Sequence, residues 1–203
     1  MARILSLVIC AIAAYLIGSA NGAIISSKYF FHKDIRQYGS GNAGLTNFYR
    51  VFGKTGALLV IAIDIGKTVL AVYVGALVYR HFGGDLKTGE LFFGFCTMLG
   101  HVFPVFYRFR GGKAVLAAGT LVMIFDWRIG LIVLAIFALI VLIFRYVSLG
   151  SIIGGAAFPI FTIIFGHPIM CIILSFMCAA LMIGRHSENM YRLAKGKESR
   201  FYY

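Results

Sequence analysis

Thirty-nine consecutive residues in the C-terminal half of the chain, from Tyr146 to Gly184, include no Lys, Arg, Asp or Glu. A single helix of that length would reach ~58 Å at a rise of ~1.5 Å per residue. The hydrocarbon core of a bilayer is only ~30 Å thick. The run therefore has to fold back, and Gly166-His167-Pro168 is suited to the turn. We expect two membrane-spanning helices in this run.

Five further apolar blocks predict five more spanning helices. They are Ile4–Ile25, Thr55–Tyr79, Leu91–Tyr107, Ala114–Phe125 and Ile129–Phe144. The first is too long for a signal-peptide core and lacks a clear cleavage site, so it is expected to remain as a helix. Hydrophobic residues make up 61% of the 203 residues and charged ones 13%, whereas soluble domains average about half and about a quarter. The sequence predicts an all-α integral membrane protein with seven transmembrane helices in a single domain, residues 1–203.

The net charge of +12 would suggest nucleic-acid binding in a soluble protein. Here the basic residues fall between the apolar blocks, so they indicate orientation in the membrane, and no nucleic acid is expected as a partner. With the N-terminus outside, 14 Lys and Arg residues lie in the inner segments and 4 in the outer ones. The split predicts a cytoplasmic C-terminus, with the polar motifs on the cytoplasmic face.

The fourth apolar block is unusually short. Gly112 to Asp126 would make ~22 Å of helix, less than the thickness of the hydrocarbon core. Either its outer end is recessed or its inner end starts below the membrane surface. Gly111-Gly112 favours the second interpretation, because such backbone is tolerated where it lines a cavity in the protein. Lys113 would then lie at the inner interface and face substrate.

The segment Gly39–Asn47 has the composition of an anion-binding loop. Its three glycines, Gly39, Gly41 and Gly44, leave backbone N–H groups able to converge on a phosphate. The polar side chains available to help are Ser40, Asn42, Thr46, Asn47 and, just beyond, Arg50. The alternative interpretation is an ordinary turn rich in Gly, Asn and Ser.

A second polar segment holds Gly100-His101-Val102-Phe103-Pro104 and then Gly111-Gly112-Lys113. Lys after two glycines suits phosphate binding, but the spacing is not that of a nucleotide-binding P-loop and Ala114 follows the lysine. Alternatively, Lys113 is an interfacial anchor and His101 a hydrogen-bonded structural histidine.

The third polar segment follows the last apolar run and contains Arg185, His186, Asn189 and Arg192. If the last helix continued inward, Arg185, Asn189 and Arg192 would share one face. A basic cluster that stops membrane transfer is the alternative. Within the second apolar block, Asp64 and Lys67 should meet on one helix face, either as an ion pair that fixes helix packing or as a proton or substrate site.

These motifs resemble the bacterial membrane acyltransferase family that uses acyl phosphate and glycerol 3-phosphate. The matching residues are Ser40–Asn47, the Asp64/Lys67 pair, Gly100–Pro104 with Gly111–Lys113, and Arg185–Asn189 with Arg192-Leu193 and Gly196–Glu198. The resemblance covers nearly the whole chain. Small departures at Leu45, Thr68 and Ala114 remove no polar group expected to act in catalysis.

The resemblance implies acyl transfer from acyl phosphate to the 1-hydroxyl of glycerol 3-phosphate, giving lysophosphatidate at the bacterial inner membrane. Arg50, Lys113 and Asn189 would hold the phosphate, and His186 would be the general base unless the acyl phosphate takes the proton. The expected catalytic residues are Ser40, Lys113, His186 and Asn189. The expected substrate-binding residues are Gly39, Gly41, Asn42, Gly44, Thr46, Asn47, Arg50, His101, Gly111, Gly112 and Ser199.

No metal or other cofactor is expected, and the further partners implied are membrane lipid and the soluble enzyme that supplies acyl phosphate. The His-x-x-x-x-Asp signature of other glycerolipid acyltransferases is absent, since Phe106 follows His101 five positions on. The rival hypothesis is a transporter of a phosphate ester or another anion. Polar motifs gathered on one membrane face argue against it, since transport sites usually lie near the midplane.

Overall fold

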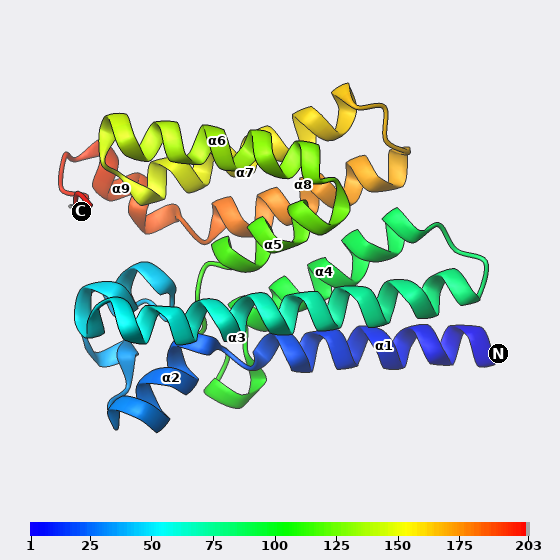
Figure 1. Ribbon diagram of the computed structural model, residues 1–203, viewed down its shortest axis with the longest axis horizontal. Helices are drawn as coiled ribbons and strands as arrows, with labels where there is room; N and C mark the ends of the chain where they lie inside the picture. Colours follow the sequence, from blue (N-terminus) through cyan, green and yellow to red (C-terminus); the bar gives the residue numbers. More distant parts are fainter. Residues whose placement is uncertain (202–203) are drawn as a thin grey trace. The chain divides into compact units, whose positions relative to one another are not determined.

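The structure is a computed structural model that describes residues 1–201, and the regular structure of those residues is entirely helical (Figure 1). Contacts between helices divide the chain into two compact units, Met1–Leu121 and Val122–Tyr203. The boundary falls within one short helix, α5 (Val115–Phe125).

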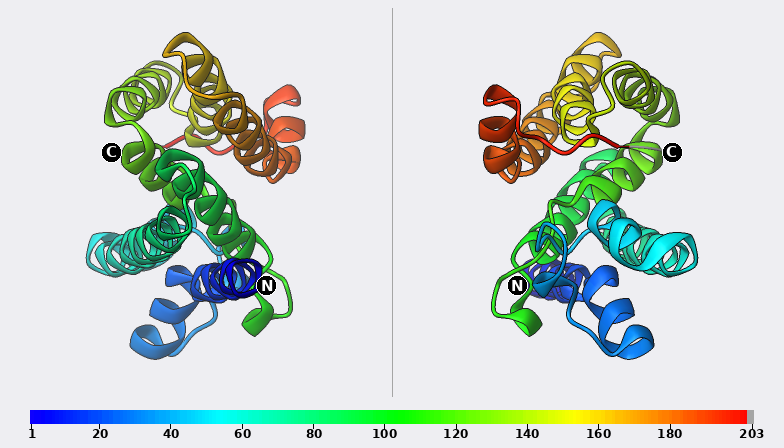
Figure 2. Two further views of the ribbon diagram at one scale, coloured as in Figure 1. Left: turned by 90° about the vertical axis from the view of Figure 1, so that its right-hand side faces the viewer. Right: turned by 90° about the vertical axis from the view of Figure 1, so that its left-hand side faces the viewer.

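The first unit is built on three packed helices, α1 (Ala2–Ser19), α3 (Leu45–His81) and α4 (Leu86–Val102). Figure 2 shows α1 and α3 nearly end-on. Glycine lets α1 and α4 approach closely, because a Cβ at Gly18 would collide with the Thr97 carbonyl and one at Gly100 with the Tyr15 carbonyl. Small residues at such crossings are typical of helices packed within a membrane.

The prediction of one helix over Ile4–Ile25 was wrong. Helix α1 ends at Ser19 and a separate helix, α2 (Gly22–Phe31), begins three residues later. Asn21 is the cause, since its side-chain oxygen accepts the Ile24 N–H at 3.0 Å and caps α2. Asn is among the preferred N-cap residues because it satisfies an N–H group that the first helical turn leaves unpaired.

The next two spans are helical, but their ends differ from the predicted ones. Helix α3 begins at Leu45, but non-helical backbone at Gly53 (φ 74°, ψ −168°) divides it into two helices, so the second of them starts close to the predicted Thr55. Helix α4 ends at Val102, not Tyr107, because Phe103 leaves helical geometry (φ −121°, ψ 64°) before Pro104. The chain then makes one 3₁₀ turn, η2 (Val105–Tyr107). Proline disfavours the α conformation in the residue before it, which explains this end.

The second unit stacks α6 (Trp127–Phe144), α7 (Val147–Ile164) and α8 (Ile169–Gly184) in sequence order. The predicted fold-back at Gly166-His167-Pro168 is confirmed, with Gly166 at φ 71°. The last helix does not continue straight past Gly184, since α9 (Ser187–Ala194) is bent by 57° from α8. Gly184, a poor helix former, ends α8. Arg185, Asn189 and Arg192 therefore do not share the face of one continuous helix.

Five helices in the described part of the chain are long and apolar enough to cross a membrane: α1, α3, α4 with η2, α6 and α7. Counting the bent pair of α8 and α9 as one span raises the number to six. Helix α5 has 11 residues, about 16 Å of helix, and falls short of a full span. The seventh span and the orientation stay predictions.

Candidate active site

The break between α1 and α2 is held by the buried pair Asp64 and Lys67 on α3. Asp64 Oδ1 accepts the Gly22 N–H at 3.0 Å, at the start of α2. Lys67 Nζ donates to the Ala20 carbonyl at 2.9 Å, at the end of α1. The two side chains also pair with each other at 2.7 Å. Buried backbone groups need partners, so this pair supplies what the interrupted helix lacks, in agreement with the packing interpretation.

His101 on α4 completes this buried cluster. Its Nδ1 lies 3.0 Å from Lys67 Nζ and 3.7 Å from Asp64 Oδ1. An ammonium group can only donate, so Nδ1 accepts and the neutral ring carries its hydrogen on Nε2. The Lys67 ammonium then has three acceptors, namely Asp64, Ala20 and His101, for its three hydrogens.

The Gly111-Gly112 segment lies directly against His101. Gly112 donates its N–H to the His101 carbonyl at 3.2 Å. A Cβ at Gly112 would stand 2.5 Å from both His101 Nε2 and the Ala43 carbonyl, and one at Gly111 would collide with the His101 carbonyl. The second motif and the Gly39–Asn47 loop therefore meet at Gly112, and only a residue without a side chain fits between them.

Asn21 links the same loop to the helix break. Its side-chain nitrogen donates to the Ala43 carbonyl at 3.1 Å, while its oxygen caps α2. Sequence analysis missed Asn21 as a site-building residue because it treated the first apolar block as one helix. The signal was available, since an Asn inside an apolar run is an N-cap candidate.

Asn47 sets the shape of the Gly39–Asn47 loop from inside. Its oxygen accepts the Ser40 N–H at 2.9 Å, and its nitrogen donates to the carbonyls of Tyr38 at 3.0 Å and Asn42 at 3.1 Å. Gly39 has a φ of 60°, and a Cβ there would collide with Asn47 Oδ1. The side chain predicted to bind substrate is thus engaged with the backbone of its own loop.

The remaining predicted residues of the first unit lie around this loop. Ser40 and Arg50 are exposed, and Asn42, Thr46 and Lys113 are partly exposed. The loop leads straight into α3, whose N-cap is Gly44 without a side-chain cap. Exposed N–H groups at a helix start favour anions. The first unit therefore brings together the loop, His101 and Gly111–Lys113.

His186, Asn189 and Ser199 belong to the second unit. His186 is buried, and its Nδ1 donates to the Met182 carbonyl at 2.8 Å. Asn189 donates to Glu198 Oε1 at 2.6 Å, Ser148 to the same oxygen at 2.7 Å, and Arg192 to Oε2 at 2.8 Å. The sequence motif includes Glu198 but assigns it no role. In the structure its carboxylate accepts hydrogen bonds from three polar side chains.

The pKa of Glu198 follows from these contacts. Partial burial would raise the pKa, but the hydrogen bonds from Asn189, Ser148 and Arg192 outweigh it and hold the pKa of Glu198 below its usual value. The carboxylate is therefore ionised at neutral pH, and its two oxygens can accept all three hydrogen bonds.

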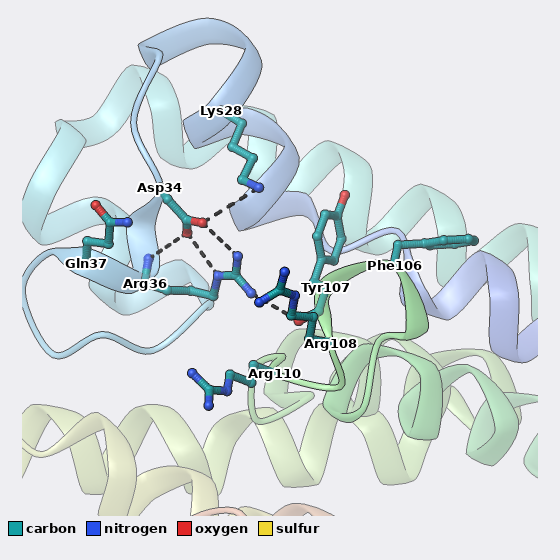
Figure 3. Close-up of a pocket in the computed structure, with 8 residues that line it drawn as sticks. All are labelled: Lys28, Asp34, Arg36, Gln37, Phe106, Tyr107, Arg108 and Arg110. Carbon is teal, nitrogen blue, oxygen red and sulfur yellow. Dashed lines mark hydrogen bonds and ion pairs between the residues drawn. The ribbon is translucent and has the colours of Figure 1, made fainter.

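A basic hollow of about 440 Å³ lies beside the site in the first unit (Figure 3). Its lining comes from α2, from the 3₁₀ turn η1 (Ile35–Gln37) and from the chain around η2. The lining residues are Lys28, Asp34, Arg36, Gln37, Phe106, Tyr107, Arg108 and Arg110. Hydrogen bonds from the Arg36 side chain hold the pKa of Asp34 at about 2, so this carboxylate is ionised at neutral pH.

A sequence model of the family described as "Glycerol-3-phosphate acyltransferase" matches residues 8–196. The chain belongs to this family. The match extends through both compact units and contains the four motifs from which the resemblance was inferred, except Lys197 and Glu198 at the end of the fourth. The inferred family is therefore confirmed. The membrane character and the acyltransferase activity on glycerol 3-phosphate follow from family membership.

Similar proteins agree with this assignment. A glycerol-3-phosphate acyltransferase of Thermoanaerobacter sp. (strain X514) is 42% identical, over 95% of this chain and 94% of the relative. One of Staphylococcus carnosus (strain TM300) is 38% identical, over 95% and 96%. The crystal structure of PlsY, an integral membrane glycerol 3-phosphate acyltransferase, in its glycerol 3-phosphate form matches with a TM-score of 0.88 at 34% identity, over 97% of this chain and 96% of that one. Its lysophosphatidic acid form matches with a TM-score of 0.85 at 33% identity.

Proposed function

We propose that the chain transfers the acyl group of an acyl phosphate to the 1-hydroxyl of glycerol 3-phosphate, giving lysophosphatidate and inorganic phosphate. The family assignment supports the acceptor. The main structural support for the location of the site is that the Gly39–Asn47 loop meets His101 and Gly111–Gly112. The solved relatives, in glycerol 3-phosphate and lysophosphatidic acid forms, are consistent with this acceptor and product.

The proposed step is a direct displacement. The 1-hydroxyl oxygen attacks the acyl carbonyl carbon, the bond from that carbon to the phosphate oxygen breaks, and phosphate leaves with the electron pair. The hydroxyl proton passes to His186 or to the departing phosphate. Because the donor is already activated, the protein contributes mainly by holding the reactants in line and stabilising the negative charge that develops.

Roles within the first unit follow from exposure. Arg50 and Ser40 are exposed at the loop, and Lys113 is partly exposed beside Gly112, so we assign these three to the phosphate of glycerol 3-phosphate. A guanidinium suits phosphate because it donates in a bidentate fork. The roles proposed for His186 and Asn189 rest on the resemblance of their motif.

The donor is tested with the purified protein in lipid. Acyl phosphate and acyl-CoA are offered separately with glycerol 3-phosphate, and lysophosphatidate and free phosphate are measured. We expect equal amounts of both products from acyl phosphate and none above background from acyl-CoA. Turnover with acyl-CoA alone would overturn the donor assignment and leave the acyltransferase assignment intact.

Lys113 is tested against a matched lysine outside the site. Lys113→Ala should raise the KM for glycerol 3-phosphate at least about tenfold, the loss of one charge-assisted contact of ~1.4 kcal/mol or more. Lys195→Ala removes the same charge from an exposed residue after α9 and should change KM less than twofold. Equal effects of the two substitutions would show that Lys113 is only an interfacial anchor.

Transport is not favoured as an alternative. Its main support was a pair of charges inside a span, but Asp64 and Lys67 are bonded to each other and to the backbone at the α1–α2 break. These contacts explain the charges without a translocated substrate.

We also propose seven spans with the N-terminus outside, the C-terminus in the cytoplasm and the site open to the cytoplasmic face of a bacterial inner membrane. The asymmetry of basic residues supports this orientation. Helix α5 would be the seventh, incomplete span.

A further inference from the structure

We propose that the basic hollow between α2, η1 and the chain around η2 binds the phosphate of an anionic membrane lipid, at a site separate from the acyl-transfer site. None of the residues assigned above to glycerol 3-phosphate or catalysis lines this hollow. The inference therefore goes beyond the proposed function and does not depend on it.

Charge is the first observation. The lining carries four cationic side chains, Lys28, Arg36, Arg108 and Arg110, and one carboxylate, Asp34. The carboxylate is shared by Arg36 at 2.7 Å and Lys28 at 3.7 Å. Arg108 and Arg110 have no ion-pair partner within residues 1–201. The hollow thus keeps a net positive charge, and two guanidinium groups remain available for bidentate contact with phosphate.

Tyr107, which directly precedes Arg108, is held by the cations on the opposite side of the hollow. Arg36 donates to the Tyr107 carbonyl at 3.1 Å and lies over the Tyr107 ring, 5.9 Å from its centroid. Lys28 lies 5.7 Å from the same centroid. These contacts fasten α2 and η1 to η2, so the cations on both sides of the hollow are presented together, as Figure 3 shows.

Arg108 and the residue after it have a strained backbone. Arg108 and Phe109 have φ values of 56° and 58°, in the left-handed region that side chains other than Gly rarely adopt. The turn is fixed by the Phe109 N–H to the Pro104 carbonyl at 2.9 Å and the Arg110 N–H to the Tyr107 carbonyl at 3.2 Å. Such strained conformations are concentrated at functional sites.

The surroundings of the hollow point to a lipid rather than a soluble anion. Phe106 and Phe109 alternate with the arginines and are 61% and 58% exposed. On α2, Tyr29 and Phe30 are 74% and 60% exposed. Figure 3 shows the Phe106 ring directed away from Asp34 and Arg36. Exposed aromatic side chains beside basic ones are typical of protein at the membrane interface, where anionic lipids are attracted.

The test measures lipid binding to the whole detergent-solubilised protein by native mass spectrometry, together with its thermal unfolding temperature. The probes are phosphatidylglycerol, zwitterionic phosphatidylcholine, and inorganic phosphate at the same concentration. We expect phosphatidylglycerol to form retained adducts and to raise Tm, and neither of the other probes to match it.

The decisive variant is Arg108→Gln/Arg110→Gln, because both side chains are exposed and unpaired in the first unit and their loss should leave the fold intact. Phosphatidylglycerol binding should fall about tenfold or more. Arg3→Gln/Arg80→Gln removes the same charge from exposed residues of α1 and α3 and should bind as the wild type does. Arg108→Lys/Arg110→Lys keeps the charge without the fork and should be intermediate.

Three outcomes would overturn the proposal. The first is unchanged phosphatidylglycerol binding in Arg108→Gln/Arg110→Gln. The second is an equal loss in the control variant, which would show that binding follows net charge alone. The third is displacement of the lipid by inorganic phosphate at equal concentration, which would assign the hollow to a soluble anion. If Arg108→Gln/Arg110→Gln unfolds, the comparison of Arg108→Lys/Arg110→Lys with the wild type decides.

Discussion

At the scale of single residues, this chain places a buried ion pair where an apolar helix is interrupted. Asp64 and Lys67 are 2% and 5% exposed at their side chains. Charges at such depth are normally costly. They persist here because Gly22 N–H and the Ala20 carbonyl, left unpaired by the break after α1, need charged or polar partners. The break after α1 thus accounts for the buried charges, and the charged pair in turn stabilises the break.

Removing one partner of this pair should be worse than removing both. Lys67→Met leaves the Asp64 carboxylate buried without its cation and should cost about 3–5 kcal/mol of unfolding free energy. Asp64→Asn/Lys67→Met keeps a polar group for the Gly22 N–H and should lose less. Unfolding in detergent micelles, followed by the loss of helical circular dichroism, measures both variants.

Glu188→Gln is the control for that comparison. It breaks an ion pair with Arg192 in which Glu188 is 88% exposed, and such exposed pairs contribute at most about 1 kcal/mol. If Asp64→Asn/Lys67→Met proves less stable than Lys67→Met, the cost of Lys67→Met does not come from the unpaired Asp64 charge, and the expectation is contradicted.

At the scale of elements, the site depends on close approach of backbone segments. Gly112 stands between the Ala43 carbonyl of the loop and the His101 ring of α4. No side chain fits at this position, so the two motifs can approach each other only because residue 112 is a glycine. The glycines that sequence analysis interpreted as phosphate ligands are, at this position, also the means of assembling the site.

Gly112→Ala should therefore abolish most activity, at least about tenfold in kcat/KM, by pushing the loop away from His101. The matched substitution is Gly119→Ala, because a Cβ at Gly119 in α5 meets nothing within 4 Å. That variant should keep wild-type activity and gain up to about 1 kcal/mol of helix stability. Equal activity of the two variants would contradict the role assigned to the contact at Gly112.

The C-terminal segment depends on Glu198 in a comparable way. Its lowered pKa means that the folded protein binds this proton less tightly than the unfolded chain, whose carboxyl has a pKa near 4.5. The stabilisation is therefore complete above about pH 4.5 and is lost as the pH falls through the lower pKa of the folded state.

Thermal unfolding as a function of pH tests this linkage. The wild type should lose Tm on acidification below pH 4.5, whereas Glu198→Gln should start lower at neutral pH and lose less. Glu188→Gln, a carboxylate exposed to solvent on α9, should follow the wild-type pH profile. A wild-type profile in Glu198→Gln would show that the contacts with Ser148, Asn189 and Arg192 add no stability.

At the scale of the whole molecule, the number of spans depends on α5. Cysteine substitutions in a background without the four natural cysteines can report the side of each segment. With seven spans, a membrane-impermeant maleimide should label Arg3→Cys and Arg80→Cys in intact spheroplasts. It should label Lys33→Cys and Lys195→Cys only after permeabilisation.

Labelling of Lys195→Cys together with Arg80→Cys would mean that α5 does not cross the bilayer. The chain would then have six spans and a C-terminus outside. Labelling of Lys33→Cys in intact spheroplasts would reverse the proposed orientation of the first unit.

The membrane class, the turn at Gly166-His167-Pro168, the approximate places of the apolar helices and the family could all be predicted from the sequence. This is possible because apolar run length and motif order are properties of the chain alone. The sequence also placed Asp64 and Lys67 on one face of one helix, since a separation of three residues is sufficient for that.

The contacts of those residues depend on how the helices pack. Three sets of contacts join segments that are distant in the sequence: Lys67 with His101, Gly112 with Ala43, and three donors with Glu198. The end of α1 at Ser19 is a further feature that packing explains. A hydropathy pattern does not show where a helix breaks, so it does not show which backbone N–H and carbonyl groups the break leaves unpaired. For that reason the roles of Asn21 and Glu198, and the hydrogen bonds of Asn47 to the backbone of its own loop, become apparent only once the helices are packed.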